Sequence, residues 1–380
     1  MMSTHFLLDI AIILLFTKIF GLITKRFSMP QVLGALLAGL ILGPAGIDLL
    51  HETEFLSSVA ELGVIVLMFS AGLETDLKEL RKSGKASLII AIIGVIVPLL
   101  GGALVSFIFN KNILQDIFIG VILTATSVSI TVETLQEMGK LKTESGTAIL
   151  GAAVIDDILG IIALTLVTST ATPNAPNIFI VLLKILGFFA VCIVAGLLFY
   201  YLFQWLSQHE GKKRRIPIFS LAFCLVLSYL AEEFGVADIT GAYIAGLILC
   251  NTLQAHYIGR RVEIISYMFL SPIFFASIGI KTSIMGMDGR IILFTVLIVA
   301  VAILTKIVGC GLGAKLCGYT SKESYRIGVG MISRGEVALI VANKGAAVGL
   351  MQEAFFAPII IMVIITTLVT PIWLKFAYRH

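Results

Sequence analysis

Apolar runs of about 20 residues recur from one end of this chain to the other, and each is long enough to cross a bilayer as an α-helix. Hydrophobic residues make up 58% of the 380 positions and charged residues 13%, too few polar groups to cover a water-soluble fold. The alternation of polar and apolar residues typical of a membrane β-barrel is absent. Because backbone groups in a bilayer must be hydrogen-bonded within their own segment, we predict an all-α polytopic membrane protein.

Thirteen transmembrane helices are predicted. Their basic residues lie mostly in every second loop, 19 on one side and 3 on the other, and such an excess is typical of the cytoplasmic side. We therefore expect a protein of the bacterial inner membrane, with its N-terminus outside and its C-terminus in the cytoplasm, surrounded by lipid and not bound to nucleic acid. The predicted helices span approximately residues 6–24, 30–47, 57–73, 86–109, 115–137, 145–170, 178–206, 216–233, 238–253, 265–281, 290–314, 325–348 and 354–378.

The chain contains an internal repeat with an offset of 207 residues. Residues 34–42 (GALLAGLIL) match residues 241–249 (GAYIAGLIL) at seven of nine positions, and Gly72 falls on Gly279 at the same offset. Convergent packing of small residues would explain one match but not a shared register. The offset relates helices one to six to helices eight to thirteen, which enter the membrane from opposite sides. This predicts two six-helix inverted-topology repeats plus a linker helix, a plan common among secondary transporters.

Two adjacent carboxylates, Asp156 and Asp157, lie near the middle of the sixth predicted helix. Neither can stay ionised inside a bilayer without a cation, a basic partner or water. Neighbours on a helix point about 100° apart, so one can face a cavity while the other faces a neighbouring helix. A structural ion-pair anchor is the alternative interpretation, but ionisable groups within membranes favour a functional site.

A matching positive charge, Lys306, lies well inside the eleventh predicted helix. A buried lysine can carry a proton as well as serve as a counter-charge. A lysine that only neutralises an aspartate remains the alternative.

The fifth and twelfth predicted helices have polar centres that coincide under the repeat, at residues 123–131 (LTATSVSIT) and 328–336 (GVGMISRGE). Hydroxyl groups in membrane helices commonly bond only to their own helix. The repeat symmetry instead favours two broken helices, whose free carbonyls and half-helix ends can hold an ion. We expect Arg334 and Glu336 to neutralise each other or the helix ends. No nucleophile–base set, phosphate-binding loop or zinc spacing occurs, so we expect neither an enzyme nor a cofactor.

Together these motifs resemble the second monovalent cation:proton antiporter family, and within it the NapA-like and GerN-like Na⁺/H⁺ antiporters. The resemblance covers essentially the whole chain. It implies an NhaA-like antiporter fold with two broken crossing helices, in a homodimer whose core moves like an elevator. It assigns residues 1–83 and 216–285 to dimerisation helices, 84–170 and 286–380 to core transport helices, and 171–215 to a linker helix with its loops.

The resemblance also implies a role for each site residue. Asp157 would carry the cation and the proton, and Asp156 would pair with Lys306 when no cation is bound. Thr126 and Ser127 would line the crossing of the broken helices, and Na⁺ would bind at Asp157, Asp156 and Thr126. Exchange would be electrogenic, with more than one proton per cation.

A K⁺/H⁺ or mixed monovalent cation antiporter of the Kef type is the main alternative, because carboxylates and carbonyls alone do not fix cation size. Kef-type relatives typically have glutamine in place of the first aspartate, whereas this chain has Asp156. They usually also carry a cytoplasmic nucleotide-binding domain, and we expect no soluble regulatory domain in this chain. A gated channel and a receptor are further alternatives, and the inverted repeat favours alternating access over both.

Overall fold

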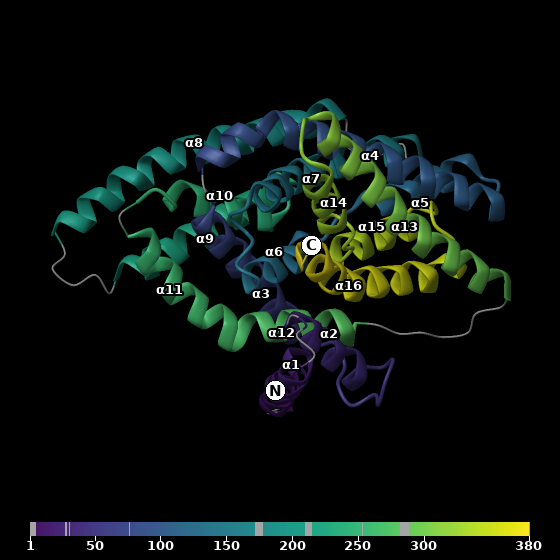
Figure 1. The fold of residues 1–380 in the computed structure, drawn as a ribbon, viewed down its shortest axis with the longest axis horizontal. Helices are drawn as coiled ribbons and strands as arrows, with labels where there is room; N and C mark the ends of the chain where they lie inside the picture. The colour runs from purple at the N-terminus through teal and green to yellow at the C-terminus, as the bar shows by residue number, and fades with distance from the viewer. Residues whose placement is uncertain are drawn as a thin grey trace.

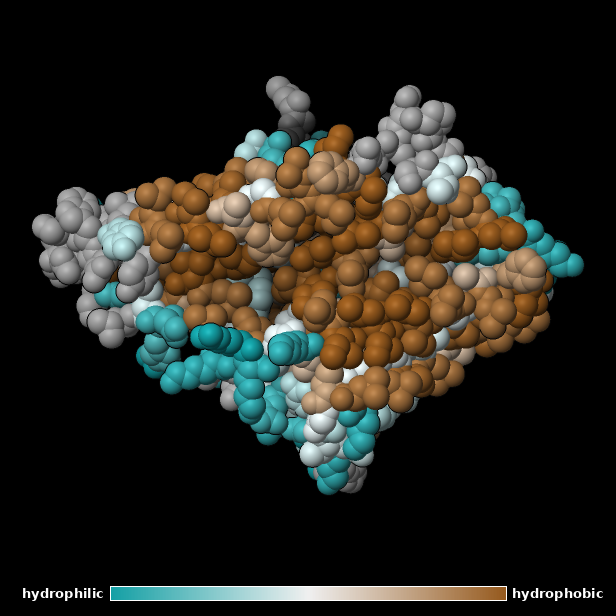
Figure 2. Space-filling view, turned by 90° about the horizontal axis from the view of Figure 1, so that it is seen from above, coloured by the Kyte–Doolittle hydropathy of each residue, from teal (hydrophilic) through white to brown (hydrophobic). Residues whose placement is uncertain are grey.

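The computed structural model describes residues 5–26, 29, 31–75, 77–171, 178–209, 215–252, 254–281 and 289–379, and the regular structure in these ranges is helical. Ten described segments are long and apolar enough to cross a membrane, and two shorter apolar helices accompany them. Figure 2 shows a face covered mainly by hydrophobic residues, with hydrophilic residues gathered along an edge and at the ends. The all-α membrane fold is thereby confirmed, while the count of thirteen helices stays a prediction.

The helices pack as two groups, which lie side by side in Figure 1. The first, which we call the scaffold group, contains α1 (His5–Arg26), α2 (Gln31–Leu42), α3 (Glu54–Glu74), α9 (Ile216–Glu233), α10 (Asp238–Leu249), α11 (Ala255–Ile265), the π-helical turn η2 (Ser266–Leu270) and α12 (Ser271–Ile280). The second, the core group, contains α4 (Leu77–Phe109), α5 (Ile113–Thr124), α6 (Val128–Glu137), α7 (Glu144–Ala171), α13 (Gly289–Leu316), α14 (Ser321–Gly330), α15 (Glu336–Ala347), the 3₁₀ turn η3 (Glu353–Phe355) and α16 (Phe356–Arg379).

Helices α8 (Ile178–His209) and α6 join the groups, and α16 also contacts α2. The long helix α8 contacts α7 on one side and α9 and α10 on the other. The short helix α6 lies between the groups in Figure 1 and contacts α2 and α3 as well as α7 and α16. The predicted linker at residues 171–215 corresponds to α8, although residues 172–177 and 210–214 lie outside the described ranges.

Glycines at matched positions of the repeat make matched close contacts within the scaffold group. A Cβ on Gly39 of α2 would overlap the Ala276 backbone of α12, and a Cβ on Gly246 of α10 would overlap the Phe69 backbone of α3. Gly279 and Gly72, on the partner helices, are equally crowded. Small residues let two membrane helices approach until their backbones touch, which adds van der Waals contact where no hydrophobic effect acts between them. The sequence repeat therefore has a counterpart in the packing.

The largest difference from the predicted helix bounds concerns the tenth predicted helix. It was expected to begin at residue 265, but helical structure begins at Ala255 and continues through η2 into α12. Consequently Arg260 and Arg261, expected in a loop, lie within α11. Only Ala255, Ile258 and Val262 of α11 are buried, at the spacing of an amphipathic helix. Because its other face is polar, α11 contains no long apolar run that would mark it in the sequence.

Candidate functional site

Two broken helices meet inside the core group, as the polar segments predicted. Between α5 and α6, residues 125–127 leave the helical conformation, and between α14 and α15, residues 331–335 do the same. The backbone N–H of Ser127 donates to the carbonyl of Ser333 at 2.8 Å, so each break satisfies a group that the other leaves free. Thr131 Oγ1 in α6 donates to the carbonyl of Gly330 at the end of α14, at 2.7 Å. The two breaks thus form one hydrogen-bonded junction in the membrane.

Where the two non-helical segments touch, there is no room for a side chain on each of them. A Cβ on Gly335 would lie 2.6 Å from Ser127 Oγ, a separation that a side-chain carbon does not tolerate. Thr126 and Ser127 are 1% and 2% exposed. Thr126 Oγ1 donates to the carbonyl of Thr124 at 3.3 Å, and Ser127 Oγ lies 3.1 Å from Ser129 Oγ. These hydroxyls lie at the crossing of the broken helices, and their role in binding a cation stays a prediction.

Arg334 supplies a positive charge to the second break and is completely buried. Its Nη1 donates to the carbonyls of Met331 and Ile332, each at 3.2 Å, and its Nη2 donates to the carbonyl of Ala302 at 3.3 Å. These carbonyls follow the end of α14 or belong to α13, so the guanidinium neutralises the negative end of a half-helix. That role matches one of the two expectations for Arg334. The side chain of Glu336, the first residue of α15, lies outside the described part of the structure, so its pairing with Arg334 stays a prediction.

Asp156 of α7 and Lys306 of α13 form a buried ion pair. Lys306 Nζ donates to the two carboxylate oxygens of Asp156 at 3.0 and 3.3 Å, and the side chains are 0% and 2% exposed. Gly94 of α4 packs beside the pair: a Cβ there would lie only 2.5 Å from Cys310 Sγ, whereas its 3.8 Å distance to Lys306 Nζ would be an ordinary contact. Removing one partner of such a pair leaves an uncompensated charge and typically costs about 3–5 kcal/mol. The pair expected from the resemblance is therefore present, and each partner depends on the other.

Asp157 is the next residue along α7 and is partly exposed, unlike its neighbour. The structure thus gives the two carboxylates different surroundings, as their spacing on a helix predicted. Arg334 is close enough to Asp156 to interact with it electrostatically, and Arg334 belongs to the same break as Ser333, which bonds Ser127. The ion pair and the crossing are therefore parts of one continuous site.

Several residues that support this site were not identified from the sequence. Thr366 Oγ1 of α16 accepts from the backbone N–H of Arg334 at 3.3 Å, and Thr367 Oγ1 donates to its carbonyl. Within the described residues, Arg334 Nε and Ser333 Oγ are buried without a hydrogen-bond partner. Paired threonines in an otherwise apolar helix are the only sequence signal of this support, and they more commonly bond to their own helix.

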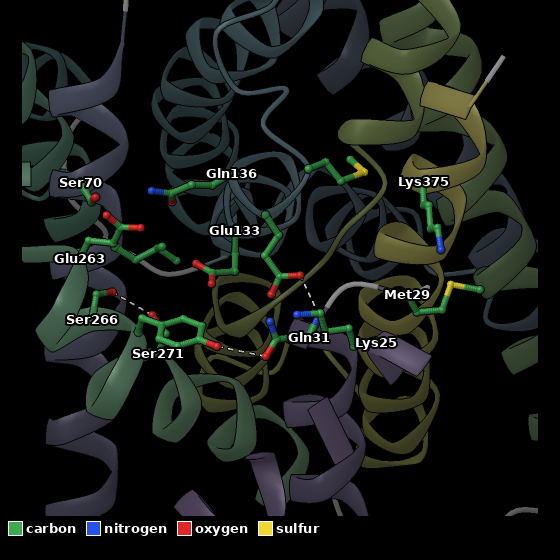
Figure 3. A pocket seen from close by; sticks show the side chains of 14 residues that line it. Lys25, Met29, Gln31, Ser70, Glu133, Gln136, Glu263, Ser266, Ser271 and Lys375 are labelled. Atoms are coloured by element: carbon green, nitrogen blue, oxygen red, sulfur yellow. Dashed lines mark hydrogen bonds between the residues drawn. The ribbon is translucent and has the colours of Figure 1, made fainter. Parts of the chain in front are cut away.

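A second polar region lies where the two groups meet, at the end of α6. A cavity of about 590 Å³ opens there, and Figure 3 shows Glu133 pointing into it. Lys25 and Lys375 line the same cavity, which places it at the end of the molecule predicted to face the cytoplasm. Glu133 and Glu137 fall in the last turns of the fifth predicted helix, residues 115–137, and the sequence did not indicate a cavity beside them. Its other lining residues are Met29, Gln31, Leu67, Ser70, Gln136, Glu137, Met138, Glu263, Ser266, Tyr267 and Ser271.

A second lysine–carboxylate pair lies outside the membrane-spanning segments. Lys281 Nζ is 3.1 Å from Glu52 Oε1, with side chains 31% and 49% exposed. Partial burial raises the pKa of Glu52, but the hydrogen bond from Ser57 and the nearby Lys281 outweigh it, so the pKa lies below its ordinary value.

Comparison with known proteins extends these observations to the whole chain. Residues 11–380 match the family model described as sodium/hydrogen exchanger, transmembrane. The chain is 40% identical over 378 residues to the Na⁺/H⁺-K⁺ antiporter GerN of Bacillus cereus, covering 99% of this chain and 97% of that protein. It is 36% identical over 371 residues to a Na⁺/H⁺ antiporter of Enterococcus hirae, covering 97% and 96% of the two chains.

A solved structure shares the fold. The sodium proton antiporter MjNhaP1 of Methanocaldococcus jannaschii, determined at pH 8, superimposes with a TM-score of 0.74 at 19% identity, covering 98% of this chain and 99% of that one. At that identity the likeness concerns the fold. The family match and the relatives confirm the resemblance drawn from the sequence motifs: the chain belongs to the sodium/hydrogen exchanger family.

Proposed function

We propose that this chain is a secondary active Na⁺/H⁺ antiporter whose exchange site is centred on Asp156 and Asp157. The observation that carries the proposal is the buried carboxylate–lysine pair beside two broken helices. Curated relatives of nearly equal length, named as Na⁺/H⁺ antiporters, support it. A carboxylate within a membrane can be neutral with a proton bound or neutralised by a cation, and exchange needs a group that alternates between these states.

In this proposal Na⁺ binds at Asp157, Asp156 and Thr126. Asp157 is the group that alternates between cation and proton, since its side chain is partly exposed whereas that of Asp156 is buried. Hydroxyl and carbonyl oxygens freed at the breaks would complete the ligand set, because hard monovalent cations prefer oxygen ligands. Protons and Na⁺ therefore compete for one site.

Lys306 couples the charges in this scheme. When Na⁺ arrives, Asp156 turns towards the ion and Lys306 loses its counter-charge. An ammonium group without a partner is costly in an apolar setting, so Lys306 releases its proton. A proton from Lys306 in addition to one from Asp157 makes exchange electrogenic.

The architecture proposed for transport consists of thirteen transmembrane helices in two inverted repeats. The matched contacts of Gly39 and Gly246 support the repeat. The scaffold group would form a homodimer, and the core group would move against it like an elevator, carrying the ion pair and the crossing together. We place the protein in the bacterial inner membrane with the N-terminus outside and the C-terminus in the cytoplasm.

A K⁺/H⁺ or mixed-cation antiporter is the second candidate function. The observation that favours it is the 40% identity to GerN, whose name includes K⁺ beside Na⁺. The carboxylates and carbonyls of the site do not by themselves select cation size.

Purified protein in proteoliposomes tests the proposal. With an imposed pH gradient, addition of Na⁺ is expected to dissipate the gradient, and comparison with Li⁺ and K⁺ ranks the cations. A larger response to K⁺ than to Na⁺ would establish the second candidate. A pH gradient that no monovalent cation dissipates would overturn antiport altogether.

A further inference from the structure

The inner end of α6 is tied to the scaffold group by two hydrogen bonds. Glu137 Oε2 accepts from the backbone N–H of Gln31 at 2.6 Å, and Gln136 Nε2 donates to Glu74 Oε1 of α3 at 2.8 Å. Figure 3 shows the bond of Gln31 at the edge of the cavity. Both bonds join the last turn of α6 to helices of the other group.

The first of these bonds is an unusual helix cap. Where another described helix has a side-chain cap, the residue just before it provides the cap, as Thr53 does for α3 and Asn112 for α5. The N-terminus of α2 is capped by a carboxylate 106 residues away, which accepts from Gln31 and also interacts with the backbone N–H of Val32. The first N–H groups of a helix have no partner within the helix, and a carboxylate satisfies their partial positive charge well.

The same helix also forms part of the crossing of the broken helices, beside the proposed ion site. At its start, Ser127 bonds the second break, and within it Thr131 bonds the end of α14. Since α6 is only 10 residues long, any movement of the crossing relative to α2 and α3 must move Glu137 and Gln136 with it. Both hydrogen bonds then break, and the N-terminus of α2 loses its cap.

We propose that Glu137 and Gln136 form an inner latch that stabilises the cavity-open conformation of this protein and opens each time the core group moves. The inference rests on the proposed alternating-access function. The latch determines how the molecule divides its time between conformations, while the ion pair of Asp156 determines what is exchanged. Two hydrogen bonds, each involving a carboxylate, are strong enough to shift such an equilibrium.

The cavity offers a matched control. Glu263 of α11 also lines the cavity and is also a carboxylate, but it forms no ion pair or side-chain hydrogen bond within the described residues and belongs to the scaffold group. A substitution there removes the same charge from the same cavity and leaves both hydrogen bonds of the latch in place.

The test measures conformer populations in lipid nanodiscs by electron–electron double resonance. Spin labels are placed at Leu225→Cys in α9 and Leu316→Cys in α13, which are 37% and 75% exposed, after the five natural cysteines are replaced. Labelled protein is diluted with unlabelled protein so that distances within one subunit dominate. Gln136→Ala with Glu137→Ala is expected to lower the ratio of cavity-open to cavity-closed conformers about tenfold relative to the parent.

Glu137→Gln should give a smaller shift in the same direction, and it serves if the double variant does not fold. Glu263→Ala should keep the parent ratio. An unchanged ratio in the latch variants, or an equal shift with Glu263→Ala, would overturn the latch. Exchange by the parent in proteoliposomes is measured separately: exchange with an unchanged conformer ratio refutes only the latch, whereas absent exchange with a shifted ratio refutes only the transport function.

Discussion

Two lysine–carboxylate pairs in this molecule have almost the same geometry. Lys306 Nζ lies 3.0 Å from Asp156 Oδ1, and Lys281 Nζ lies 3.1 Å from Glu52 Oε1. Their surroundings differ: the first two side chains are 0% and 2% exposed, the second two 31% and 49%. Distance alone would assign both pairs the same importance.

Burial separates the two pairs. Water and salt can solvate either member of the exposed pair, so the interaction contributes about 0–1 kcal/mol, and losing it changes little. In the buried pair neither charge can exist without compensation, so any event that draws Asp156 away must be matched by a second event at Lys306. A buried pair of this kind can couple cation binding to proton movement, and an exposed pair cannot.

Asp157→Asn should have the largest effect on transport, because it removes the group that alternates between cation and proton beside the buried pair. We expect Na⁺-driven exchange in proteoliposomes to fall by at least about 100-fold, while the protein keeps its melting temperature. Glu52→Gln, in the exposed pair, serves as the control and should exchange at the parent rate. Parent-like exchange by Asp157→Asn would show that the site lies elsewhere.

Asp156→Asn should have the largest effect on stability. Lys306 then remains buried without a counter-charge, which costs about 3–5 kcal/mol and should lower the melting temperature in Na⁺-free detergent solution. Adding Lys306→Gln removes the unpaired charge and should restore much of the loss. If the double variant melts no higher than Asp156→Asn alone, the two side chains are not coupled in this way.

Lys306→Gln should affect the charge moved per cycle more than the movement of the cation. Asp157 remains, so exchange continues, but one proton fewer moves in each turnover. Currents on solid-supported membranes, normalised to Na⁺ flux, are expected to decrease. Parent-like charge movement in an active variant would reduce the lysine to a structural anchor.

Glu52→Gln should have the smallest effect, a destabilisation of at most about 1 kcal/mol at neutral pH. Because the pKa of Glu52 is lowered in the folded protein, its contribution is present above the ordinary value of 4.5 and is lost as pH falls through the lower folded value. The difference in melting temperature between parent and variant should therefore shrink as pH falls below 4.5. A difference that grows on acidification would contradict the assigned direction.

The broken helices were predictable because they follow from a local conflict in the sequence, and so was the need of the buried carboxylates for a basic partner; the choice of Asp156 as the partner of Lys306 came from the family resemblance. Charged or hydroxyl side chains at mid-membrane, as at Asp156 and Ser127, have few ways to be satisfied. The sequence repeat also indicated that the two polar segments, residues 123–131 and 328–336, occupy equivalent positions in the two halves of the chain. These constraints act on single residues and are therefore visible without a structure.

The support of Arg334 and the cavity at the end of α6 were not predictable, since both depend on how distant helices approach one another. Arg334 is satisfied by the carbonyl of Ala302, and every residue has a carbonyl, so no sequence pattern marks that partner. Glu263 reaches the cavity from α11. This helix is half polar, so its apolar residues do not form a continuous run and the predicted helix begins at residue 265 rather than at Ala255. Contacts between helices that are distant in the sequence arise from packing, and the hydrophobic periodicity of the sequence does not indicate them.

Proton release on Na⁺ binding tests the central claim most directly. Purified protein in weakly buffered detergent solution is titrated with Na⁺ near pH 8 while the released protons are measured. The parent is expected to release protons as Na⁺ saturates its site, Lys306→Gln to release fewer, Glu52→Gln to match the parent, and Asp157→Asn to release none. Proton release by Asp157→Asn equal to that of the parent, at the same Na⁺ affinity, would contradict the account.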